Sequence, residues 1–491
     1  NLKKNYHKLG IILPKLSLPA DLEELKVTGL NIDSREIKPG NIFIALNGEK
    51  DDGNHYIKEA LDNGAILVLT DNLSIQNKVK VFFYPNLSRE VGIIASFFYG
   101  QPSNQLDIFC VTGTNGKTSY VESLSQMLNK IGVKNGYLST IKASLNGNKL
   151  YNSKLTTPDP VFLQKMFHQF VLSDCKIAAI EASSHGIIQN RISGTKIKVA
   201  VLSSFSQDHL DYHKTIESYE EAKKSLFLRE SIENYLINID SNFGERLYQE
   251  LKISNKKVYS ISTSKDAEFR IKFIQKPISK LTVEMETPFG YINFRLNTFS
   301  EMMALNISLA MASLTLIDIP LAKLSEVAED ISLSEGRMEV IEINKSSRCI
   351  IDYAHTPDAL FRALKEIKNN FPGKVWCLFG CGGQRDKLKR SLMGKIAEEL
   401  SDHIILTNDN PRYEAPRDII NEILVGMENV NSLHIEEDRK LAIEYGLKEI
   451  ISSDEPISLL IAGKGHEDFQ LIDGKSIPLK DRNIVLDSLD F

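Results

Sequence analysis

Residues 111–118 read Val111-Thr112-Gly113-Thr114-Asn115-Gly116-Lys117-Thr118, between an apolar run at 108–111 and a helical pattern. Glycines at 113 and 116 let the backbone N–H groups turn toward an anion, Lys117 adds a positive charge, and the Thr118 hydroxyl can bind Mg²⁺. A strand, a glycine loop and a helix in this order are the context that a phosphate-binding loop requires. The residues therefore predict an α/β fold that binds a nucleotide at this loop.

The helix after the loop is predicted from apolar residues at spacings of three and four. They are Val121, Leu124, Leu128 and Ile131, and the pattern ends near Gly132. The full pattern G-x-x-x-x-G-K-[ST] would need glycine at position 111, so only a shortened G-x-x-G-K-T remains. An ordinary glycine turn also matches so short a motif, and the flanking strand and helix are what favour the nucleotide site.

The composition is typical of a soluble globular protein, with 491 residues, 42% of them hydrophobic and 25% charged. This length exceeds what one hydrophobic core usually organises, so about three domains are expected. The net charge is −5 and the two signs are mixed, without the basic cluster that binds nucleic acid. We therefore expect small-molecule substrates and no nucleic-acid partner.

The cysteines and the apolar runs predict a cytoplasmic protein. The five cysteines are odd in number and four lie in or beside apolar runs, which argues against a disulfide framework. No segment approaches the ~20 apolar residues of a membrane-spanning helix. The polar start, Asn1-Leu2-Lys3-Lys4, does not resemble a signal peptide, and the missing initial methionine predicts a trimmed N-terminus.

Domain boundaries are placed where the sequence pattern changes, because no linker or repeat marks them. Residues 1–97 carry short strand-like runs, at 41–46 and 65–69, which predict a small α/β domain. Residues 98–335 alternate apolar runs with helical patterns, which predicts a mostly parallel sheet, and residues 336–491 repeat that alternation. The clearest later runs of the central domain are 177–180, 199–202 and 235–239.

Four apolar runs in residues 336–491 are each followed at once by polar or glycine residues. The runs are 349–351, 375–379, 404–406 and 457–461. The segments after them are Asp352-Tyr353-Ala354-His355, Gly380-Cys381-Gly382-Gly383, Asn408-Asp409-Asn410-Pro411 and Gly463-Lys464-Gly465-His466-Glu467. Ligands of a doubly wound sheet bind beyond the carboxyl ends of its strands, so we expect these loops to share one crevice.

A candidate Mg²⁺ ligand, Glu181, follows the apolar run 177–180. Parallel strands end at one edge of a sheet, so this carboxylate is expected near the Mg²⁺ of the phosphate loop. His209 follows the next run and fits a solvated loop histidine as well as a metal ligand. The spacing around Lys223 indicates only one more charge on a solvated helix face, without a function.

Taken together, the order and identity of these motifs resemble the Mur ligases, the ATP-dependent amide-forming enzymes of peptidoglycan precursor synthesis. The similarity is greatest to the subgroup that adds the third residue of the stem peptide. In the first two domains it rests on Asp33-Ser34-Arg35, Asp52-Gly53, Thr112–Thr118, Thr156-Thr157-Pro158 and Glu181-Ala182-Ser183-Ser184-His185-Gly186. Further along it rests on Gly336-Arg337-Met338-Glu339, Asp352–Asp358, Gly382–Asp386, Asp409–Arg412 and Gly463–Glu467.

The resemblance implies three domains: a UDP-binding α/β domain, a P-loop ATPase domain with a mostly parallel sheet, and a Rossmann-like domain that binds an amino acid. It also implies a ligase that uses ATP and Mg²⁺ to add meso-2,6-diaminopimelate to UDP-N-acetylmuramoyl-L-alanyl-D-glutamate through an acyl phosphate. Such an enzyme is cytoplasmic, serves cell-wall synthesis, cell shape and cell division, and is expected here to be a monomer. The chemistry consists of positioning and charge neutralisation, so no nucleophilic side chain is needed.

The resemblance assigns a role to each matching position. Lys223 takes the place of a carbamylated lysine, whose carbamate binds a second Mg²⁺ with Glu181 and His209; with Lys117 these are the catalytic residues, and Thr118 is a further metal ligand. ATP contacts fall on Thr112, Gly113, Thr114, Asn115, Gly116, Lys117, Thr118, Asn238, Arg337, His355 and Asp358, with Asp240 near the adenine. Contacts to the UDP-muramoyl dipeptide fall on Ile32, Ser34, Thr156, Thr157, Ser183, Gln189 and Arg191.

Two segments depart from the family pattern. Ser300-Glu301-Met302-Met303-Ala304-Leu305-Asn306 stands where the family usually has Gly-x-Phe-Asn-x-x-Asn, so only Asn306 of its two asparagines remains. This puts in doubt the nucleotide contact of the first asparagine. The loop Glu49-Lys50-Asp51 differs from the family's His-x-Ala, which puts uracil contacts there in doubt.

The amino-acid substrate is implied by Arg385, Asp409, Asn410, Pro411, Arg412, Gly463 and Glu467. Meso-diaminopimelate has a carboxylate at its distal end that lysine lacks, and two arginines can bind it, Arg412 with bidentate geometry. Glu467 would take the distal ammonium, and the backbone at Gly463 would add a contact. A surface arginine in a proline turn is the alternative for Arg412, but its place after a strand favours the substrate.

Other functions account for less of the chain. An L-lysine-adding ligase would have no use for Arg412. A folate-polyglutamating ligase would lack the first domain, and a P-loop phosphotransferase or GTPase would leave the third domain unexplained. A non-catalytic nucleotide-binding regulator would have no reason to keep Lys117, Glu181, His209 and Lys223 together.

Overall fold

A computed structural model of the chain describes residues 7–13, 20–48, 51–75, 80–152, 155–208, 210–276, 280–429 and 432–489. The chain forms two compact units. One comprises Asn1–Thr112, Gly132–Ala200 and Ala222–Tyr235, and the other Gly113–Ile131, Val201–Glu221 and Leu236–Phe491. Both units are α/β, which confirms the predicted fold class.

The first part of the chain contains a four-stranded parallel sheet in the order β3-β4-β5-β6. Its elements are β1 (His7–Lys8), α1 (Leu9–Ile12), α2 (Ala20–Glu23), β2 (Lys26–Val27), β3 (Gly29–Asn31), β4 (Asn41–Ala45), α3 (Ile57–Asp62), β5 (Leu67–Thr70), β6 (Val81–Phe83) and α4 (Leu87–Phe98). Short 3₁₀ turns lie at Ser34–Glu36, Gly53–Tyr56, Leu73–Ile75 and Pro102–Asn104.

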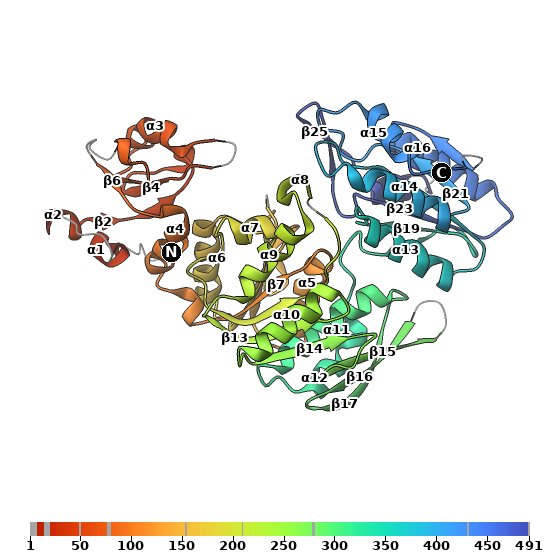
Figure 1. The fold of residues 1–491 in the computed structure, drawn as a ribbon, viewed down its shortest axis with the longest axis horizontal. Coiled ribbons are helices and arrows are strands. Elements are labelled where there is room, and N and C mark those ends of the chain that lie inside the picture. Colours follow the sequence, from red (N-terminus) through yellow and green to blue (C-terminus); the bar gives the residue numbers. More distant parts are fainter. Residues whose placement is uncertain are drawn as a thin grey trace. The chain divides into compact units, whose positions relative to one another are not determined.

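Successive residues of β4 and β5 face opposite helices of this part. Ile42, Ile44 and Leu67 pack in a core with α4, whereas Phe43 and Val68 pack in a second core with α3. Figure 1 shows α3 and α4 on opposite sides of the sheet. Both faces are therefore apolar, which explains why these strands read as short continuous apolar runs.

The central part of the chain contributes one long mixed sheet, β10-β9-β8-β11-β7-β12-β13-β14-β15-β16-β17. The strands are β7 (Asp107–Thr112), β8 (Asn135–Leu138), β9 (Lys142–Leu145), β10 (Asn148–Asn152), β11 (Ile177–Glu181), β12 (Ile197–Leu202), β13 (Ile232–Asn238), β14 (Val258–Ser262), β15 (Phe269–Lys276), β16 (Lys280–Thr287) and β17 (Gly290–Leu296). The helices are α5 (Lys117–Lys130), α6 (Pro160–Leu172), α7 (Ser184–Ile188), α8 (Leu210–His213), α9 (Ile216–Phe227), α10 (Asn242–Ile253), α11 (Glu301–Thr315) and α12 (Leu321–Glu326), with a 3₁₀ turn at Ala328–Asp330.

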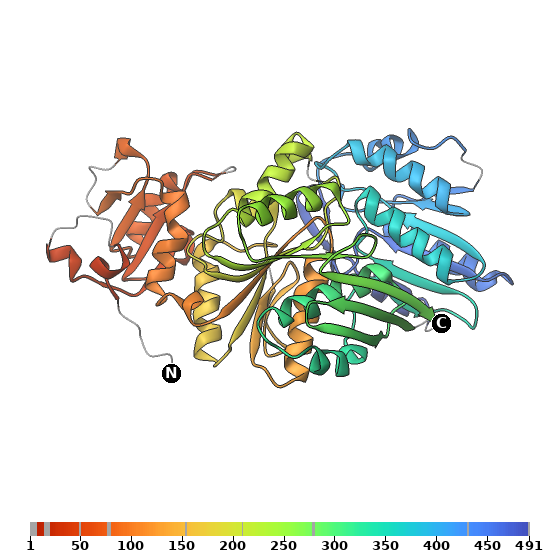
Figure 2. The same ribbon diagram turned by 60° about the horizontal axis from the view of Figure 1, so that its bottom comes forward.

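The predicted parallel strands form the middle of this sheet, and antiparallel strands extend it at both ends. β8, β11 and β7 are parallel neighbours, as are β14 and β15. β9 and β10 at one end, and β16 and β17 at the other, pair antiparallel. The long β15–β17 ribbon is visible in green in Figure 2. In β16, buried residues alternate with more exposed ones. The sequence analysis predicted a mostly parallel sheet here and did not identify these antiparallel strands.

The last part of the chain is a doubly wound domain with the sheet order β18-β19-β23-β20-β21-β22. The strands are β18 (Glu339–Glu342), β19 (Arg348–Asp352), β20 (Lys374–Phe379), β21 (His403–Leu406), β22 (Leu433–Ile435), β23 (Ile457–Ala462), β24 (Phe469–Ile472) and β25 (Lys475–Pro478). The helices are α13 (Pro357–Asn370), α14 (Leu388–Leu400), α15 (Pro416–Leu424), α16 (Arg439–Ser452) and α17 (Asp481–Asp487).

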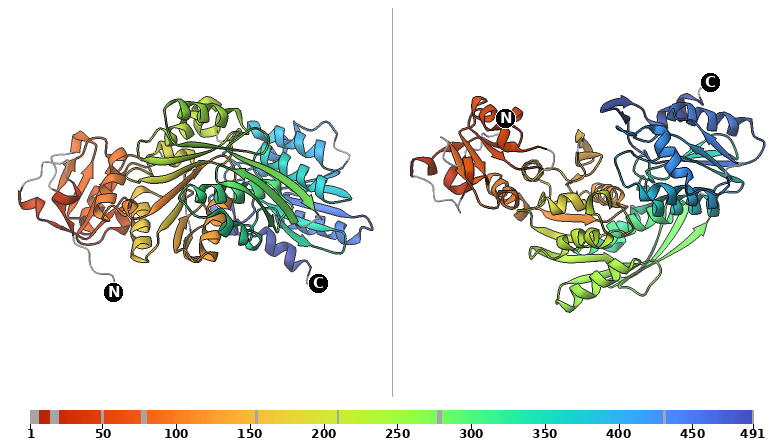
Figure 3. Two further views of the ribbon diagram at one scale, coloured as in Figure 1. Left: turned by 90° about the horizontal axis from the view of Figure 1, so that it is seen from below. Right: turned by 45° about the horizontal axis from the view of Figure 1, so that its top comes forward.

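Helices cover both faces of this last sheet. α13, α14 and α15 pack in one core with Ile350, Cys377 and Leu460, and α16 and α17 pack in another with Ile351 and Leu459. Figure 3 shows these helices, cyan to blue, around the sheet from two directions. β19, β23, β20 and β21 are adjacent and parallel, so their carboxyl ends meet at one edge, which confirms the predicted loop cluster.

Candidate active site

The phosphate loop joins β7 to α5, as predicted. Gly113 (φ 157°) and Gly116 (φ 88°) adopt backbone conformations that side chains rarely tolerate. A Cβ at either position would come within 2.1 Å of Ser203 Oγ and 2.2 Å of Asn306 Oδ1, respectively. The Lys117 ammonium donates to the carbonyls of Gly113 (2.8 Å) and Thr114 (2.9 Å). Its charge is thus held at the loop, at the start of a helix where anions bind.

The segment after β12 holds the phosphate loop in shape. The Thr114 and Asn115 N–H groups donate to Ser204 O and Ser204 Oγ, at 2.9 and 3.0 Å. Ser203 Oγ donates to the Asn115 carbonyl at 2.7 Å, and Thr114 Oγ1 donates to Ser206 O at 3.0 Å. These bonds fix the loop without using its glycine N–H groups as donors to this segment.

α11 presents Asn306 to the loop, and Met303 replaces the family's other asparagine. Asn306 is 4% exposed, and among the described residues its buried Nδ2 meets no hydrogen-bond acceptor. A buried amide donor beside the phosphate loop is suited to an anionic ligand. Met303 instead packs into the core with Phe299, and its sulfur accepts from Ser119 Oγ at 3.7 Å. The side chain at this position thus packs in the core where the resemblance implies an asparagine.

Glu181 ends β11 as a buried carboxylate, 1% exposed. Its two oxygens accept from the Thr140 N–H and hydroxyl, both at 3.0 Å. Thr140 Oγ1 also lies 3.2 Å from Thr156 Oγ1, whose hydroxyl can donate to it. Oxygen ligands are what Mg²⁺ prefers, and a buried carboxylate at a strand end offers one that is already oriented.

The residues expected at the dipeptide lie together beside Glu181. Thr157 Oγ1 donates to the Glu181 carbonyl (3.0 Å) and accepts from the Ser183 N–H (2.9 Å). Arg191 donates to Gln189 Oε1 through Nε (3.0 Å) and Nη2 (2.5 Å), and to the Thr157 carbonyl through Nη1 (2.7 Å). Ser183 and Arg191 thus contact Thr157 directly, and Gln189 holds Arg191.

Lys223 corrects one reading of the sequence. Its spacing alone indicated a solvated helix face, but the side chain is 1% exposed and lies among the largest fully buried side chains. The polar residues around Lys223 give no sign of this burial, because it depends on how α9 packs against other elements. A buried lysine is an uncommon residue that requires a specific partner or a change of charge. His209 lies outside the described residues, and so do Glu49 and Lys50.

Ser34 is buried at the start of a 3₁₀ turn after β3, and its hydroxyl donates to Glu59 Oε2 at 2.5 Å. Ile32 packs at the edge of the α4 core. At the end of β13, Asn238 Nδ2 donates to the Ser203 carbonyl at 2.8 Å. Asp240 accepts from Ser262, Thr263 and Ser264, so its carboxylate fixes the turn after β14.

Arg337 lies over the ring of Tyr353, with Cζ 4.6 Å from the ring centroid. The adjacent Met338 N–H donates to buried Asp352 at 2.8 Å, which fixes this junction. His355 Nδ1 lies 2.8 Å from the Tyr353 carbonyl, and burial together with the nearby Lys389 charge lowers the pKa of His355 to about 4. The imidazole is therefore neutral near pH 7. Asp358 accepts from Arg362, one turn along α13, at 3.0 Å.

The predicted amino-acid residues converge at the loops after β20, β21 and β23. Asn410 Nδ2 donates to Glu467 Oε2 at 2.9 Å, and the buried Lys464 ammonium donates to Glu467 Oε2 (2.8 Å) and Asn410 Oδ1 (3.2 Å). Gly463 (φ 110°) lies against Asp409, since a Cβ there would be 2.6 Å from Asp409 Oδ2.

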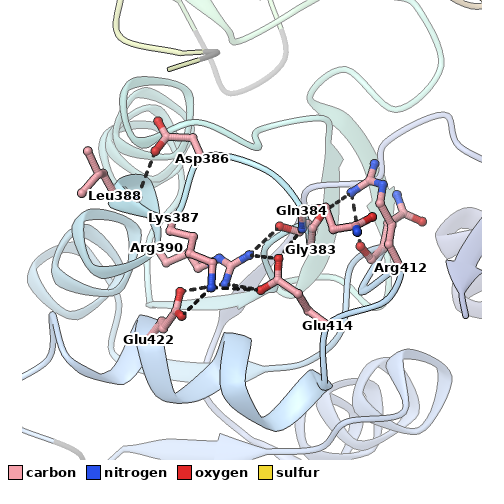
Figure 4. Close-up of polar contacts among 11 residues, drawn as sticks. Gly383, Gln384, Asp386, Lys387, Leu388, Arg390, Arg412, Glu414 and Glu422 are labelled. Carbon is pink, nitrogen blue, oxygen red and sulfur yellow. Dashed lines mark hydrogen bonds and ion pairs between the residues drawn. The ribbon is translucent and has the colours of Figure 1, made fainter. Parts of the chain in front are cut away.

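The two arginines of this cluster come from neighbouring loops. Arg412, directly after Pro411, donates from Nη1 to the Gly383 carbonyl at 2.7 Å (Figure 4). Arg385 follows in the same loop as Gly383 and is exposed. Burial and the Arg385 charge lower the pKa of Arg412 from its usual value. A guanidinium whose charge is disfavoured by a second guanidinium nearby is suited to bind a carboxylate that the two groups share.

Some residues of the site were not identified from the sequence. Thr140 orients Glu181, and Lys464 bonds both Asn410 and Glu467, yet no predicted role falls on either. Lys464 belongs to a segment singled out after β23, so its position was a usable signal. For Thr140 the sequence gives none, because its contact joins residues 41 positions apart.

Three family models match the chain in the order of its parts. The "Mur ligase family, catalytic domain" model matches residues 26–98, the "Mur ligase middle domain" model residues 111–314, and the "Mur ligase, glutamate ligase domain" model residues 336–465. The chain belongs to the Mur ligase family. This Mur ligase is thus an ATP-dependent ligase, as the motifs predicted.

Curated relatives of this Mur ligase are named UDP-N-acetylmuramoyl-L-alanyl-D-glutamate–2,6-diaminopimelate ligase. The Coxiella burnetii protein is 37% identical over 93% of this chain and 94% of its own length. The Buchnera aphidicola protein is 34% identical over 98% and 99%, and that of Neisseria meningitidis serogroup B is 36% identical over 93% of both.

Solved structures resemble this Mur ligase over 75–99% of its length. A UDP-N-acetylmuramoyl-L-alanyl-D-glutamate–2,6-diaminopimelate ligase superposes with a TM-score of 0.72 at 29% identity and covers 99% of both chains. A MurF ligase of Thermotoga maritima in complex with ADP gives 0.65 at 18% identity and covers 94% of this chain. A folylpolyglutamate synthase of Mycobacterium tuberculosis gives 0.63 at 16% and covers only 75%; these last two show the fold alone.

The cysteines and helices agree with two further expectations. Cys110, Cys175, Cys349, Cys377 and Cys381 are free and buried, without a disulfide framework. Across the described ranges, no helix has both the length and the apolar character needed to span a membrane.

Proposed function

We propose that this Mur ligase adds meso-2,6-diaminopimelate to UDP-N-acetylmuramoyl-L-alanyl-D-glutamate, with ATP as the second substrate. The observation that carries the proposal is the cluster of Arg385, Arg412, Asn410 and Glu467 at the carboxyl edge of the last sheet. It offers two guanidinium groups and a carboxylate to an amino acid whose distal end has one carboxylate and one ammonium. The names of the relatives support the same substrate.

The substrate carboxylate takes the γ-phosphoryl group of ATP and ADP leaves, because a carboxylate oxygen becomes a leaving group only as an acyl phosphate. The amine of the incoming amino acid then attacks the acyl carbon, the bond from that carbon to the phosphate oxygen breaks, and phosphate and the amine's proton leave as the amide forms. Lys117 and the N–H groups at the start of α5 stabilise the negative charge of the transferred phosphoryl group. The neutral His355 and the Arg337 guanidinium are assigned to the nucleotide, as is Asp358, although its carboxylate also pairs with Arg362.

The residues assigned to Mg²⁺ fit that ion by their chemistry. Glu181 supplies a buried, oriented carboxylate, and Thr118 supplies a buried hydroxyl in the first turn of α5. Bound Mg²⁺ would neutralise phosphate charge. Lys223 is assigned as a carbamate, which would replace a buried cation with a carboxylate; His209 completes the assigned set.

Thr156, Thr157, Ser183, Gln189 and Arg191 are assigned to the muramoyl dipeptide, whose D-glutamate carboxylate Arg191 can pair. Ser34 and the backbone at Ile32 are assigned to the UDP end. The proposed domains are 1–97 for UDP binding, 98–335 for ATP and 336–491 for the amino acid. Free buried thiols suit a reducing compartment, so we place the enzyme in the cytoplasm. We also propose that it acts as a monomer.

The test is a direct assay of product formation. The protein is incubated with ATP, Mg²⁺, UDP-N-acetylmuramoyl-L-alanyl-D-glutamate and either meso-diaminopimelate or L-lysine, and phosphate release and product mass are followed. We expect a product heavier by one diaminopimelate residue and one phosphate per product. Phosphate release without a new product, or a product only with lysine, would refute the proposal.

A further inference from the structure

Arg390 is a buried guanidinium beside the loops that carry Arg385 and Arg412 (Figure 4). It lies in the first turn of α14, and its side chain has no exposed surface. Nη1 donates to Glu414 at 2.9 Å and to Glu422 at 2.7 Å. Nη2 donates to the Gly382 carbonyl at 3.1 Å and to the other Glu414 oxygen at 3.2 Å. One side chain thus bonds the loop after β20 and a residue that follows β21.

Glu414 completes the connection between the two loops. Besides Arg390, its Oε1 accepts the backbone N–H of Gln384. The loops also meet directly, because the Gly383 N–H donates to the Asn410 carbonyl at 2.9 Å. Their approach is so close that a Cβ on Gly383 would lie 1.9 Å from the Pro411 oxygen. Arg390 and Glu414 therefore hold the two loops in contact. A small shift of either side chain would move both loops.

The backbone at both arginines requires such bracing. Gln384, next to Arg385, has φ 52°, and Arg412 itself has φ 56°. Residues with side chains rarely adopt this left-handed conformation, and they keep it only where the surrounding contacts enforce it. The contacts here include the Gln384–Glu414 bond, the Arg412–Gly383 bond and the pairing of the Arg412 backbone with Leu471 O (2.9 Å) and the Asp473 N–H (2.6 Å).

We propose that Arg390 is a positioning residue that acts through Glu414 to set the spacing of Arg385 and Arg412 for the second carboxylate of the amino acid. The inference rests on the proposed function, in which those two arginines bind that carboxylate. Two guanidinium groups that share one carboxylate must hold a fixed separation, and the buried network supplies it. A purely structural ion pair would stabilise the domain without affecting which amino acid is used.

Glu422 provides a matched control for Glu414. Both carboxylates accept from Arg390 Nη1, and both pair with Lys387, at 3.1 Å for Glu422 and 3.5 Å for Glu414. Within the described residues, however, only Glu414 also accepts a backbone N–H of the Arg385 loop, since Glu422 lies on α15. E414Q and E422Q thus each remove one negative charge that pairs with Arg390. Only E414Q also weakens the bond from the Gln384 N–H that joins the two loops.

The decisive readout is the ratio of kcat/KM for meso-diaminopimelate to kcat/KM for L-lysine, measured with the full-length enzyme. E414Q is expected to lower kcat/KM for diaminopimelate about tenfold or more, with lysine changed less than about twofold. E422Q is expected to keep the ratio within about twofold of the wild type. KM for ATP should stay the same in both variants, because neither Glu414 nor Glu422 belongs to the phosphate loop or to the residues assigned to ATP.

An equal fall of the ratio in both variants would overturn the proposal, and so would an E414Q enzyme that loses activity equally with both amino acids. If E414Q does not fold, R390K decides instead, because an ammonium cannot reproduce the forked bonds to Gly382 and Glu414. R390K must then lower the ratio, and an unchanged ratio refutes the inference. A wild type without preference for diaminopimelate refutes the proposed function itself, and this appears before any variant is compared.

Discussion

Lys117 shows how one side chain can serve both the shape and the chemistry of its loop. Its ammonium bonds the Gly113 and Thr114 carbonyls, so it neutralises dipoles that would otherwise repel a phosphate. We expect K117A to lower kcat about 10³-fold or more, because charge on the transferred phosphoryl group loses its partner. The midpoint of thermal unfolding should change little, since the side chain is not in a core. A folded K117A enzyme with wild-type turnover would contradict the assignment.

The burial of Lys223 and the family resemblance both indicate a specific role, whereas its spacing in the sequence indicated only a solvated charge. The side chain is 1% exposed, and a carbamate would place a carboxylate, an oxygen ligand that suits Mg²⁺, where a lysine otherwise carries an ammonium. We expect K223A to be nearly inactive and to recover part of its activity with added acetate or formate, which can replace the missing carboxylate. Phosphate release measured with and without these acids checks this. A K223A enzyme as active as the wild type without them would rule out the carbamate.

Helix α11 illustrates coupling between elements, because Glu366 of α13 caps its first turn. Met302 N–H donates to Glu366 Oε1 at 2.9 Å, and burial raises the pKa of Glu366 to about 7. This pKa lies above the ordinary value of 4.5, so the folded state holds the proton more tightly than the unfolded state. The contribution of protonated Glu366 to the free energy of unfolding is therefore complete below about pH 4.5 and is lost as the pH rises through 7.

E366Q keeps the acceptor and removes the titration. We expect E366Q to be more stable than the wild type at pH 8.5, by at most about 3 kcal/mol, and the difference to shrink toward pH 5. Urea unfolding at the two pH values measures this, with E399Q, an exposed carboxylate on α14, as the control. A difference between E366Q and wild type that does not vary with pH would exclude this role for Glu366.

The elements that were predicted correctly are those whose apolar runs are buried on both faces. β7, β20, β21 and β23 follow directly from such runs, and the glycine and polar residues after them mark the site. The antiparallel pairing of β16 and β17 and the left-handed backbone at Arg412 depend on partners distant in sequence. Residue order alone does not specify those partners, so neither could be predicted.

Across the whole molecule, the residues proposed for the three substrates lie on different structural parts. We assign ATP to the phosphate loop, the dipeptide to the residues beside the Glu181 strand end, and the amino acid to the loops of the last sheet. The loops of the last sheet are expected to prefer meso-diaminopimelate over L-lysine, and this preference can be measured. When lysine binds, a site with two arginines for one carboxylate loses the charge-assisted hydrogen bonds to that carboxylate, and such a loss discriminates strongly.

The measurement that follows is the ratio of kcat/KM for meso-diaminopimelate to that for L-lysine, in the wild type and in R412A. We expect a ratio of about 10³ or more in the wild type and the loss of most of that preference in R412A, because Arg412 is assigned to the distal carboxylate that lysine lacks. R417A, an exposed arginine on α15, is the matched control and should keep the preference. Comparable kcat/KM values for the two amino acids in the wild type would contradict the assignment of the substrate.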